Sequence, residues 1–187
     1  MTSSASVGGR ERLRLFLAFL LPDAAVQGLV RWQRDDLGAS DRVRVVRPEN
    51  LHVTIAFLGS RPARELDDIT GALREAVADA DAPVLTPVRY RETRSVGMLV
   101  CDDEERRATR IARDVHRRLE RLGVYEPERR PWLPHLTVVR FRERLRLQPP
   151  IPDLGPVTVS DSAVMHSVLR KSGAQYEVVQ SVPLGGG

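Results

Sequence analysis

Residues 51–55 read LHVTI, and residues 134–138 read PHLTV. In each stretch a histidine and a threonine stand two positions apart, with one apolar residue between them and another after them. Side chains two positions apart on a β-strand point to the same face of a sheet. The two stretches therefore predict two strands, each presenting an imidazole and a hydroxyl on one face and an apolar anchor to the core on the other.

A single His-x-Thr segment is weak evidence for a site, because strands commonly alternate apolar residues on the buried face with polar residues on the exposed face. Chance would place two such pairs among the four histidines in roughly 1% of sequences of this composition. The repeat therefore favours a functional pair. The candidate residues are His52 and Thr54 in the first segment and His135 and Thr137 in the second.

The patterns around these segments predict an α+β fold. Apolar periodicity indicates three helices, several longer strands and a brief extended piece. The helices are expected at 22–37, 62–77 and 109–122, and the strands at 13–20, 43–46, 51–58, 84–90, 95–100, 135–141, 157–168 and 175–183. Several strands follow one another directly, which is typical of an antiparallel sheet rather than of a doubly wound parallel one.

Boundaries and domain limits follow from turn residues and composition. Gly59 is expected to end its strand, and the last two strands are expected to pair around residues 171–173. No linker rich in Gly, Ser or Pro divides the chain. We therefore expect one domain over residues 12–184, a disordered segment at 1–11 and a short tail at 185–187.

Composition is typical of a globular protein, with 42% apolar and 29% charged residues among 187. The longest apolar run, residues 15–21, is too short to span a bilayer, and no small-x-small cleavage site follows it. We therefore expect neither a membrane segment nor a secretory signal. Cys101 is the only cysteine, which excludes an internal disulfide and is consistent with a reducing cytoplasm.

The net charge of +4 comes almost wholly from arginine, since Lys171 is the only lysine. Arginine suits bidentate contact with phosphate. These arginines are scattered among acidic residues, however, and a general preference for arginine over lysine explains most of them. The charge permits a nucleic-acid partner without indicating one.

Two imidazoles and two hydroxyls suit the opening of a cyclic phosphodiester. One group must take a proton from water while another gives a proton to the leaving oxygen. Histidine titrates near neutral pH, so one ring can be neutral while the other is protonated. Threonine hydroxyls can donate hydrogen bonds to the non-bridging phosphate oxygens. The chain has no His-x-x-x-His or Cys/His cluster, so the prediction includes neither a metal nor a cofactor.

These motifs and their flanking residues resemble the 2H phosphoesterases, and within them the RNA 2′,3′-cyclic phosphodiesterases historically called 2′-5′ RNA ligases. The resemblance covers roughly residues 12–184. It rests on RLFLA at 14–18 with LPD at 21–23, RPENLHVTIAFLG at 47–59, PHLTVVR at 134–140, and SVL at 167–169 through GAQYE at 173–177. The chain differs from the usual family pattern at two places that affect base stacking. Residues 45–46 are VV where the family often has an aromatic residue, and residues 96–99 are VGML where it often has a tryptophan.

The resemblance implies two similar lobes of antiparallel sheet with flanking helices around a central cleft, each lobe contributing one motif. It implies hydrolysis of an RNA 2′,3′-cyclic phosphate end to a 2′-phosphate. In that reaction His52 would protonate the 3′ oxygen as the acid, and His135 would activate water as the base. The remaining implied site residues are the phosphate-binding Thr54 and Thr137 and the substrate-binding Phe57 and Arg140.

Other readings stay open. The same site could act on 2′-5′-linked oligonucleotides, a nucleoside 2′,3′-cyclic phosphate or an ADP-ribose cyclic phosphate, since the loops at 91–95 and 126–132 are expected to set substrate choice. A non-catalytic RNA-end binding module is a further alternative, although binding alone needs no pair of titrating groups. We expect a monomer. We also expect His116, in a charged helix, to face solvent and His166 to lie outside the site.

Overall fold

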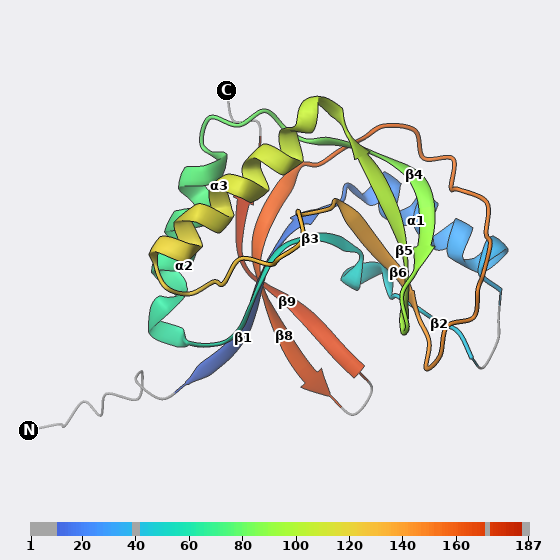
Figure 1. The fold of residues 1–187 in the computed structure, drawn as a ribbon, viewed down its shortest axis with the longest axis horizontal. Helices are drawn as coiled ribbons and strands as arrows, with labels where there is room; N and C mark the ends of the chain where they lie inside the picture. Colours follow the sequence, from blue (N-terminus) through green and yellow to red (C-terminus); the bar gives the residue numbers. More distant parts are fainter. Residues whose placement is uncertain (1–10, 39–41, 171–172, 185–187) are drawn as a thin grey trace, which may run out of the picture.

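The computed structural model describes residues 11–38, 42–170 and 173–184. Within them a single antiparallel sheet curls into a half-barrel flanked by three α-helices (Figure 1). Most of the predicted disordered segment 1–11, the tail 185–187 and the turn at 171–172 lie outside the described residues.

The elements follow the predicted order, with one strand divided in two. The strands are β1 (Arg12–Leu20), β2 (Arg44–Val45), β3 (His52–Pro62), β4 (Val84–Glu92), β5 (Val96–Asp103), β6 (His135–Arg140), β7 (Val157–Thr158), β8 (Asp161–Arg170) and β9 (Gly173–Pro183). The α-helices are α1 (Asp23–Asp36), α2 (Leu66–Val77) and α3 (Arg107–Arg121), and short 3-10 helices lie at Pro48–Asn50, Ala63–Glu65 and Glu104–Arg106.

The sheet has two halves. Its strands are hydrogen-bonded in the order β7-β4-β5-β6-β3-β1-β8-β9, and β2 pairs separately with β6. The strands β6 and β3 are the inner strands of the two halves, which diverge from this centre in Figure 1. The predicted α+β fold with an antiparallel sheet is confirmed, and the two predicted lobes are the halves of one continuous sheet.

The halves meet where β3 pairs with β6 through Val53 and Leu136, the middle residues of the two His-x-Thr segments. Both side chains are buried in the core, at 0% and 3% exposure. Because side chains alternate along a strand, the histidines and threonines on either side of this pair point to the opposite face of the sheet. Burial of two apolar residues thus decides which face carries the polar groups.

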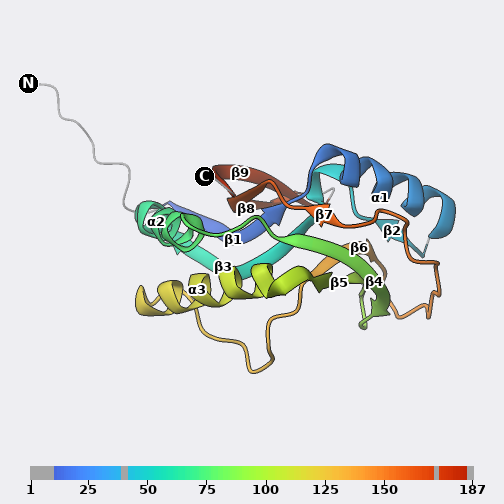
Figure 2. The same ribbon diagram turned by 90° about the horizontal axis from the view of Figure 1, so that it is seen from above.

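Helices flank both halves of the sheet. Helices α2 and α3 pack against each other, α3 also packs on β3, and α2 also packs on β8 and β9. Helix α1 lies beside the other half, at the opposite end of the molecule from α2 (Figure 2). Its Trp32 is buried and donates its indole N–H to the carbonyl of Pro150 (2.8 Å). None of the helices in the described ranges combines the length and the apolar character that crossing a bilayer requires.

Two predicted strand boundaries are wrong. Gly59 does not end its strand: β3 continues to Pro62, and the pairing with β1 skips Leu58 beside Gly59, whose φ is +67°. Glycine adopts this φ without strain, so the strand bulges and continues. The predicted strand at 157–168 is two strands, because β7 pairs with β4 at one edge and β8 pairs with β1 in the other half. An apolar run does not reveal partners that are distant in sequence.

We predict that Leu136→Ala lowers the free energy of unfolding by about 2–5 kcal/mol, because it leaves a cavity where the two halves meet. Denaturant unfolding followed by circular dichroism would measure this loss. Leu122→Ala is the matched control, since Leu122 is 44% exposed, and it should cost about 0.5 kcal/mol or less. An unchanged midpoint for Leu136→Ala would contradict a joining role for this contact.

Candidate active site

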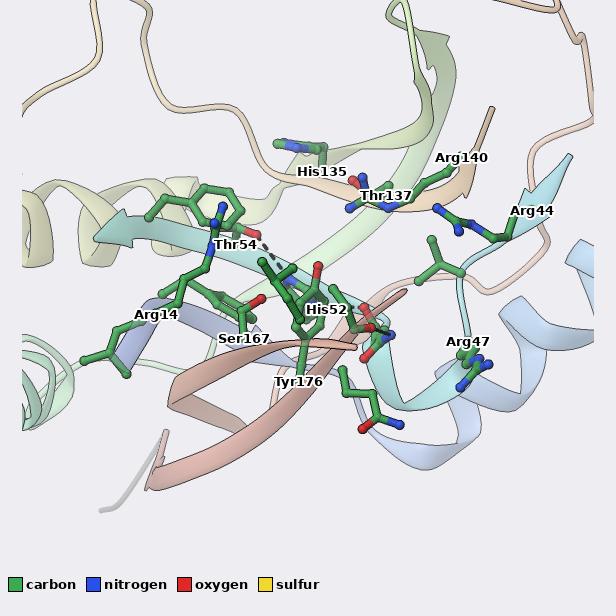
Figure 3. A pocket seen from close by; sticks show the side chains of 18 of the residues that line it. Arg14, Arg44, Arg47, His52, Thr54, His135, Thr137, Arg140, Ser167 and Tyr176 are labelled. Atoms are coloured by element: carbon green, nitrogen blue, oxygen red, sulfur yellow. Dashed lines mark hydrogen bonds between the residues drawn. The ribbon is translucent and has the colours of Figure 1, made fainter. Parts of the chain in front are cut away.

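Both His-x-Thr segments face one cleft of about 620 Å³. Its lining includes His52 and Thr54 from β3 and His135 and Thr137 from β6, which Figure 3 shows on two adjoining strands. Because β3 and β6 are antiparallel about their central pair, His52 lies across from Thr137, and Thr54 lies across from His135. Each imidazole therefore has a threonine beside it on its own strand and another on the neighbouring strand.

Each imidazole is held by the backbone carbonyl two residues before it. Nδ1 of His52 donates to the carbonyl of Asn50 (2.8 Å), and Nδ1 of His135 donates to the carbonyl of Leu133 (2.8 Å). A carbonyl oxygen only accepts, so the proton of each neutral ring is on Nδ1 and the free nitrogen is Nε2. Nε2 of His52 is 3.1 Å from Oγ1 of Thr54. Both rings are thus oriented with the same nitrogen available for proton transfer.

Aromatic rings surround His52. The ring centroids of Phe16 and Tyr176 lie 5.0 Å and 5.4 Å from its imidazole. The pKa of His52 is lowered to about 4, chiefly because burial disfavours the charged ring, with further lowering by the charges of His135 and Arg140. Without a bound anion this ring is therefore neutral at pH 7. The acid role that the resemblance implies requires an anion that raises this pKa.

A β-bulge follows the threonine in each strand. The pairing of β3 with β1 skips Ile55, and the pairing of β6 with β5 skips Val138. A bulge shifts the alternation of side chains by one residue. Regular alternation would bring the fourth residue after each histidine to the cleft, but the bulges bring the fifth. These fifth residues are Phe57 and Arg140, and both line the cleft.

The carbonyl of each bulge residue accepts a hydrogen bond from a helix side chain. Nε2 of His116 on α3 donates to Ile55 (2.8 Å), and Nε2 of Gln33 on α1 donates to Val138 (2.7 Å). The Gln33 amide also donates to the carbonyl of Val46 (3.0 Å). The prediction that His116 faces solvent is wrong, because its ring is half-buried against the sheet. Sequence reasoning missed both residues, and the one available signal was a glutamine among the buried positions of α1.

Arginines line the cleft without acidic partners. Arg14, Arg44, Arg47 and Arg140 belong to the lining, and none of the described lining residues is Asp or Glu. Within the part of the chain that the structure describes, none of these four arginines makes an ion pair. Unneutralised arginines around two imidazoles favour an anionic ligand.

The loops expected to shape the cleft do not line it. Residues 91–95 and 126–132 are absent from the lining, which instead includes β2 with the two residues that follow it, and residues of β8 and β9. Trp132 contributes differently, because its indole nitrogen donates to the carbonyl of Thr54 (3.0 Å). It therefore supports the backbone of the first motif.

The other candidate groups lie outside the cleft. His166 is not among the lining residues. Burial and, to a lesser degree, the charge of Asp103 raise the pKa of the Cys101 thiol to about 12, so this side chain stays protonated at neutral pH. Across residues 11–38, 42–170 and 173–184, no three His, Cys, Asp or Glu side chains are grouped so that they could hold a metal ion.

Known proteins are similar to this chain in sequence and in fold. A family model described as LigT like phosphoesterase matches residues 20–86. An RNA 2′,3′-cyclic phosphodiesterase of Thermus thermophilus is 28% identical over 189 residues, which cover 93% of this chain and 91% of that protein. The apo structure of E. coli LigT superposes with a TM-score of 0.78 at 22% identity, over 93% of this chain and 98% of that one. Its complex with 3′-AMP gives a TM-score of 0.76 at 22% identity, over 93% and 99% of the two chains.

The curled antiparallel sheet with three flanking helices is the 2H phosphoesterase fold. In sequence and in fold the chain is similar to LigT-like phosphoesterases, which confirms the resemblance read from the two motifs.

We predict that the His52 ring titrates with a pKa of about 4 in the ligand-free protein. Inorganic phosphate should raise this value, because a nearby anion stabilises the charged ring. Two-dimensional ¹H–¹⁵N NMR of the imidazoles would measure both values, with His52→Asn used to assign the signal. Since folding lowers this pKa, the free energy of unfolding should fall as the pH drops from about 6.5 toward 4, and fall less in His52→Asn. A ligand-free value near 6.5 would contradict this account.

Proposed function

We propose that this protein hydrolyses RNA 2′,3′-cyclic phosphate ends to 2′-phosphates, with His52 and His135 as an acid–base pair and without a metal. One observation carries the proposal: two imidazoles line one arginine-rich cleft, and each donates its Nδ1 proton to a backbone carbonyl, which leaves Nε2 unprotonated. The name of the Thermus relative and the 3′-AMP complex of E. coli LigT support RNA as the substrate class.

The proposed reaction forms one phosphorus–oxygen bond and breaks another. One imidazole takes a proton from water as the water oxygen attacks phosphorus. The bond from phosphorus to the 3′ oxygen breaks, and the other ring, as imidazolium, gives its proton to that oxygen. Thr54 and Thr137 donate hydrogen bonds to the non-bridging oxygens, where negative charge accumulates. Proton exchange with solvent then restores the two starting protonation states.

In the proposed reaction His52 is the acid and His135 is the base. The ligand-free His52 ring is neutral at pH 7, so its acid role depends on the substrate. The bound phosphodiester carries one negative charge, which opposes the positive charge of Arg140 and raises the pKa of His52. Binding of the substrate phosphodiester would thus favour the protonated form of His52, which the acid role requires.

We also propose that the protein acts as a monomer in the cytoplasm. One chain supplies both His-x-Thr segments, so the cleft needs no residue from a second copy. The single cysteine is buried and unpaired, which suits a reducing compartment.

The proposal predicts turnover of a short RNA with a 2′,3′-cyclic phosphate end in excess EDTA, with a bell-shaped pH dependence. His52→Ala and His135→Ala should each lower kcat by about 10²–10⁴-fold, because each removes a proton-transfer group. Thr54→Val and Thr137→Val should each lower kcat by about 10–10³-fold through loss of a hydrogen bond to the phosphate. Chromatography of the 2′-phosphate product would measure all of these rates.

The matched control is His166→Ala, which removes an imidazole from β8 outside the cleft and should keep wild-type turnover. Circular dichroism would establish that each variant is folded. Near-full activity in either motif variant would refute the assigned pair. RNA binding without any turnover by the wild type would favour the binding module instead.

A substrate with sulfur in place of the 3′ oxygen separates the acid from the base. A thiol has a pKa of about 8.5 and leaves as a thiolate, so its departure needs no acid. We predict that His52→Ala recovers at least about tenfold of its lost rate on this substrate, whereas His135→Ala recovers none. Recovery by the His135 variant alone would reverse the two roles.

A further inference from the structure

The two ends of the cleft differ in chemistry. Because β3 and β6 run in opposite directions from their central pair, Phe57 and Arg140 lie at opposite ends. Arg44 and Arg47 line the cleft at the Arg140 end, and Arg14 lies across the histidines from them (Figure 3). We call Arg44, Arg47 and Arg140 the basic end.

Two arginines of the basic end are held directly opposite each other. Arg44 pairs with Arg140 across β2 and β6. Like charges at such positions destabilise a sheet, and the described cleft lining offers them no acidic side chain. Backbone N–H of Val46 nevertheless ties this segment to the carbonyl of Val138 (2.9 Å), and the buried Gln33 amide donates to the carbonyls of both residues. An anion between the two guanidinium groups would relieve the repulsion that the sheet imposes.

We propose that the basic end binds the phosphodiester that links the terminal nucleotide to its 5′ neighbour. The preferred substrate is then an RNA strand rather than a cyclic mononucleotide, an inference that rests on the proposed function. Arginine binds phosphate in a bidentate manner, and hydrogen bonds between ionised partners are stronger than neutral ones. A cyclic mononucleotide has only the reacting phosphate, so it leaves Arg44 and Arg47 without an anion.

The stereochemistry of ribose fits this arrangement. The base is attached to C1′ beside C2′, and the 5′ chain continues from C4′ beside C3′. With the cyclic phosphate between the histidines, the base and the upstream phosphate point to opposite ends of the cleft. The base then meets Phe57, whose side chain is 65% exposed and free to stack.

The same placement orients the leaving group. With the 5′ chain at the basic end, the 3′ oxygen also faces that end. His52 lies on that side of the central pair, since it is across from Thr137 on the way to Arg140. His52 is therefore the imidazole nearer to the 3′ oxygen, which agrees with its proposed role as the acid.

The test compares kcat/KM for adenosine 2′,3′-cyclic phosphate with kcat/KM for a trinucleotide that has the same cyclic end. The wild type should prefer the trinucleotide by about 10–100-fold, the range expected for one or two charge-assisted contacts. Arg44→Gln should bring this ratio toward one, and Arg44→Lys should restore part of it. Arg113→Gln is the matched control, because it removes the same charge from an exposed position on α3 and should leave the ratio unchanged.

A binding measurement gives a second readout. Affinity for a trinucleotide ending in a 2′-phosphate should fall with salt, and the slope of log affinity against log salt should be smaller by about 0.7 in Arg44→Gln than in the wild type. Circular dichroism would verify that this variant is folded.

The outcomes separate the two proposals. Equal wild-type kcat/KM for the mononucleotide and the trinucleotide would overturn the subsite and leave the proposed function standing. If the wild type cleaves neither substrate, the proposed function fails, and the binding measurement alone tests the phosphodiester subsite. Equal affinity and equal salt dependence in the wild type and Arg44→Gln would then overturn it.

Discussion

The contact between Val53 and Leu136 is the constraint on which the site depends. It joins the two halves of the sheet, and it involves the middle residue of each His-x-Thr segment. Because both side chains are buried in the core, the four polar groups beside them must face the cleft. The same apolar pair that stabilises the fold thus sets the register of the candidate catalytic groups, so a slip of one residue would turn every one of them into the core.

The two halves repeat one local design and then diverge in chemistry. Each motif strand has a bulge after its threonine, and a helix side chain, His116 or Gln33, holds the bulge carbonyl. This arrangement turns the fifth residue after each histidine into the cleft. That residue is Phe57 in one half and Arg140 in the other, so a symmetric scaffold presents an aromatic end and a basic end. An asymmetric ligand such as a nucleotide needs such a difference.

The sequence was sufficient for the order of most elements and for the candidate residues that line the cleft. The period-two pattern around each motif predicted a strand, and the consecutive strand patterns predicted an antiparallel sheet. Phe57 and Arg140 came from the family resemblance, because regular alternation would have chosen the residues before them. His116 was misplaced at the surface, since a helix surrounded by charged residues does not reveal that one of its polar groups reaches a strand carbonyl.

Local pattern and residue chemistry are properties of the chain itself, so the sequence by itself determined the two His-x-Thr strands, the helices and the acid–base character of the candidate groups. Pairing between distant segments depends on packing of the whole core, and only the tertiary structure decided it. The fold brought the motifs together, placed Arg44 against Arg140, and buried His52 among aromatic rings that lower its pKa. Desolvation and charge proximity act through space, and spacing along the chain does not encode them.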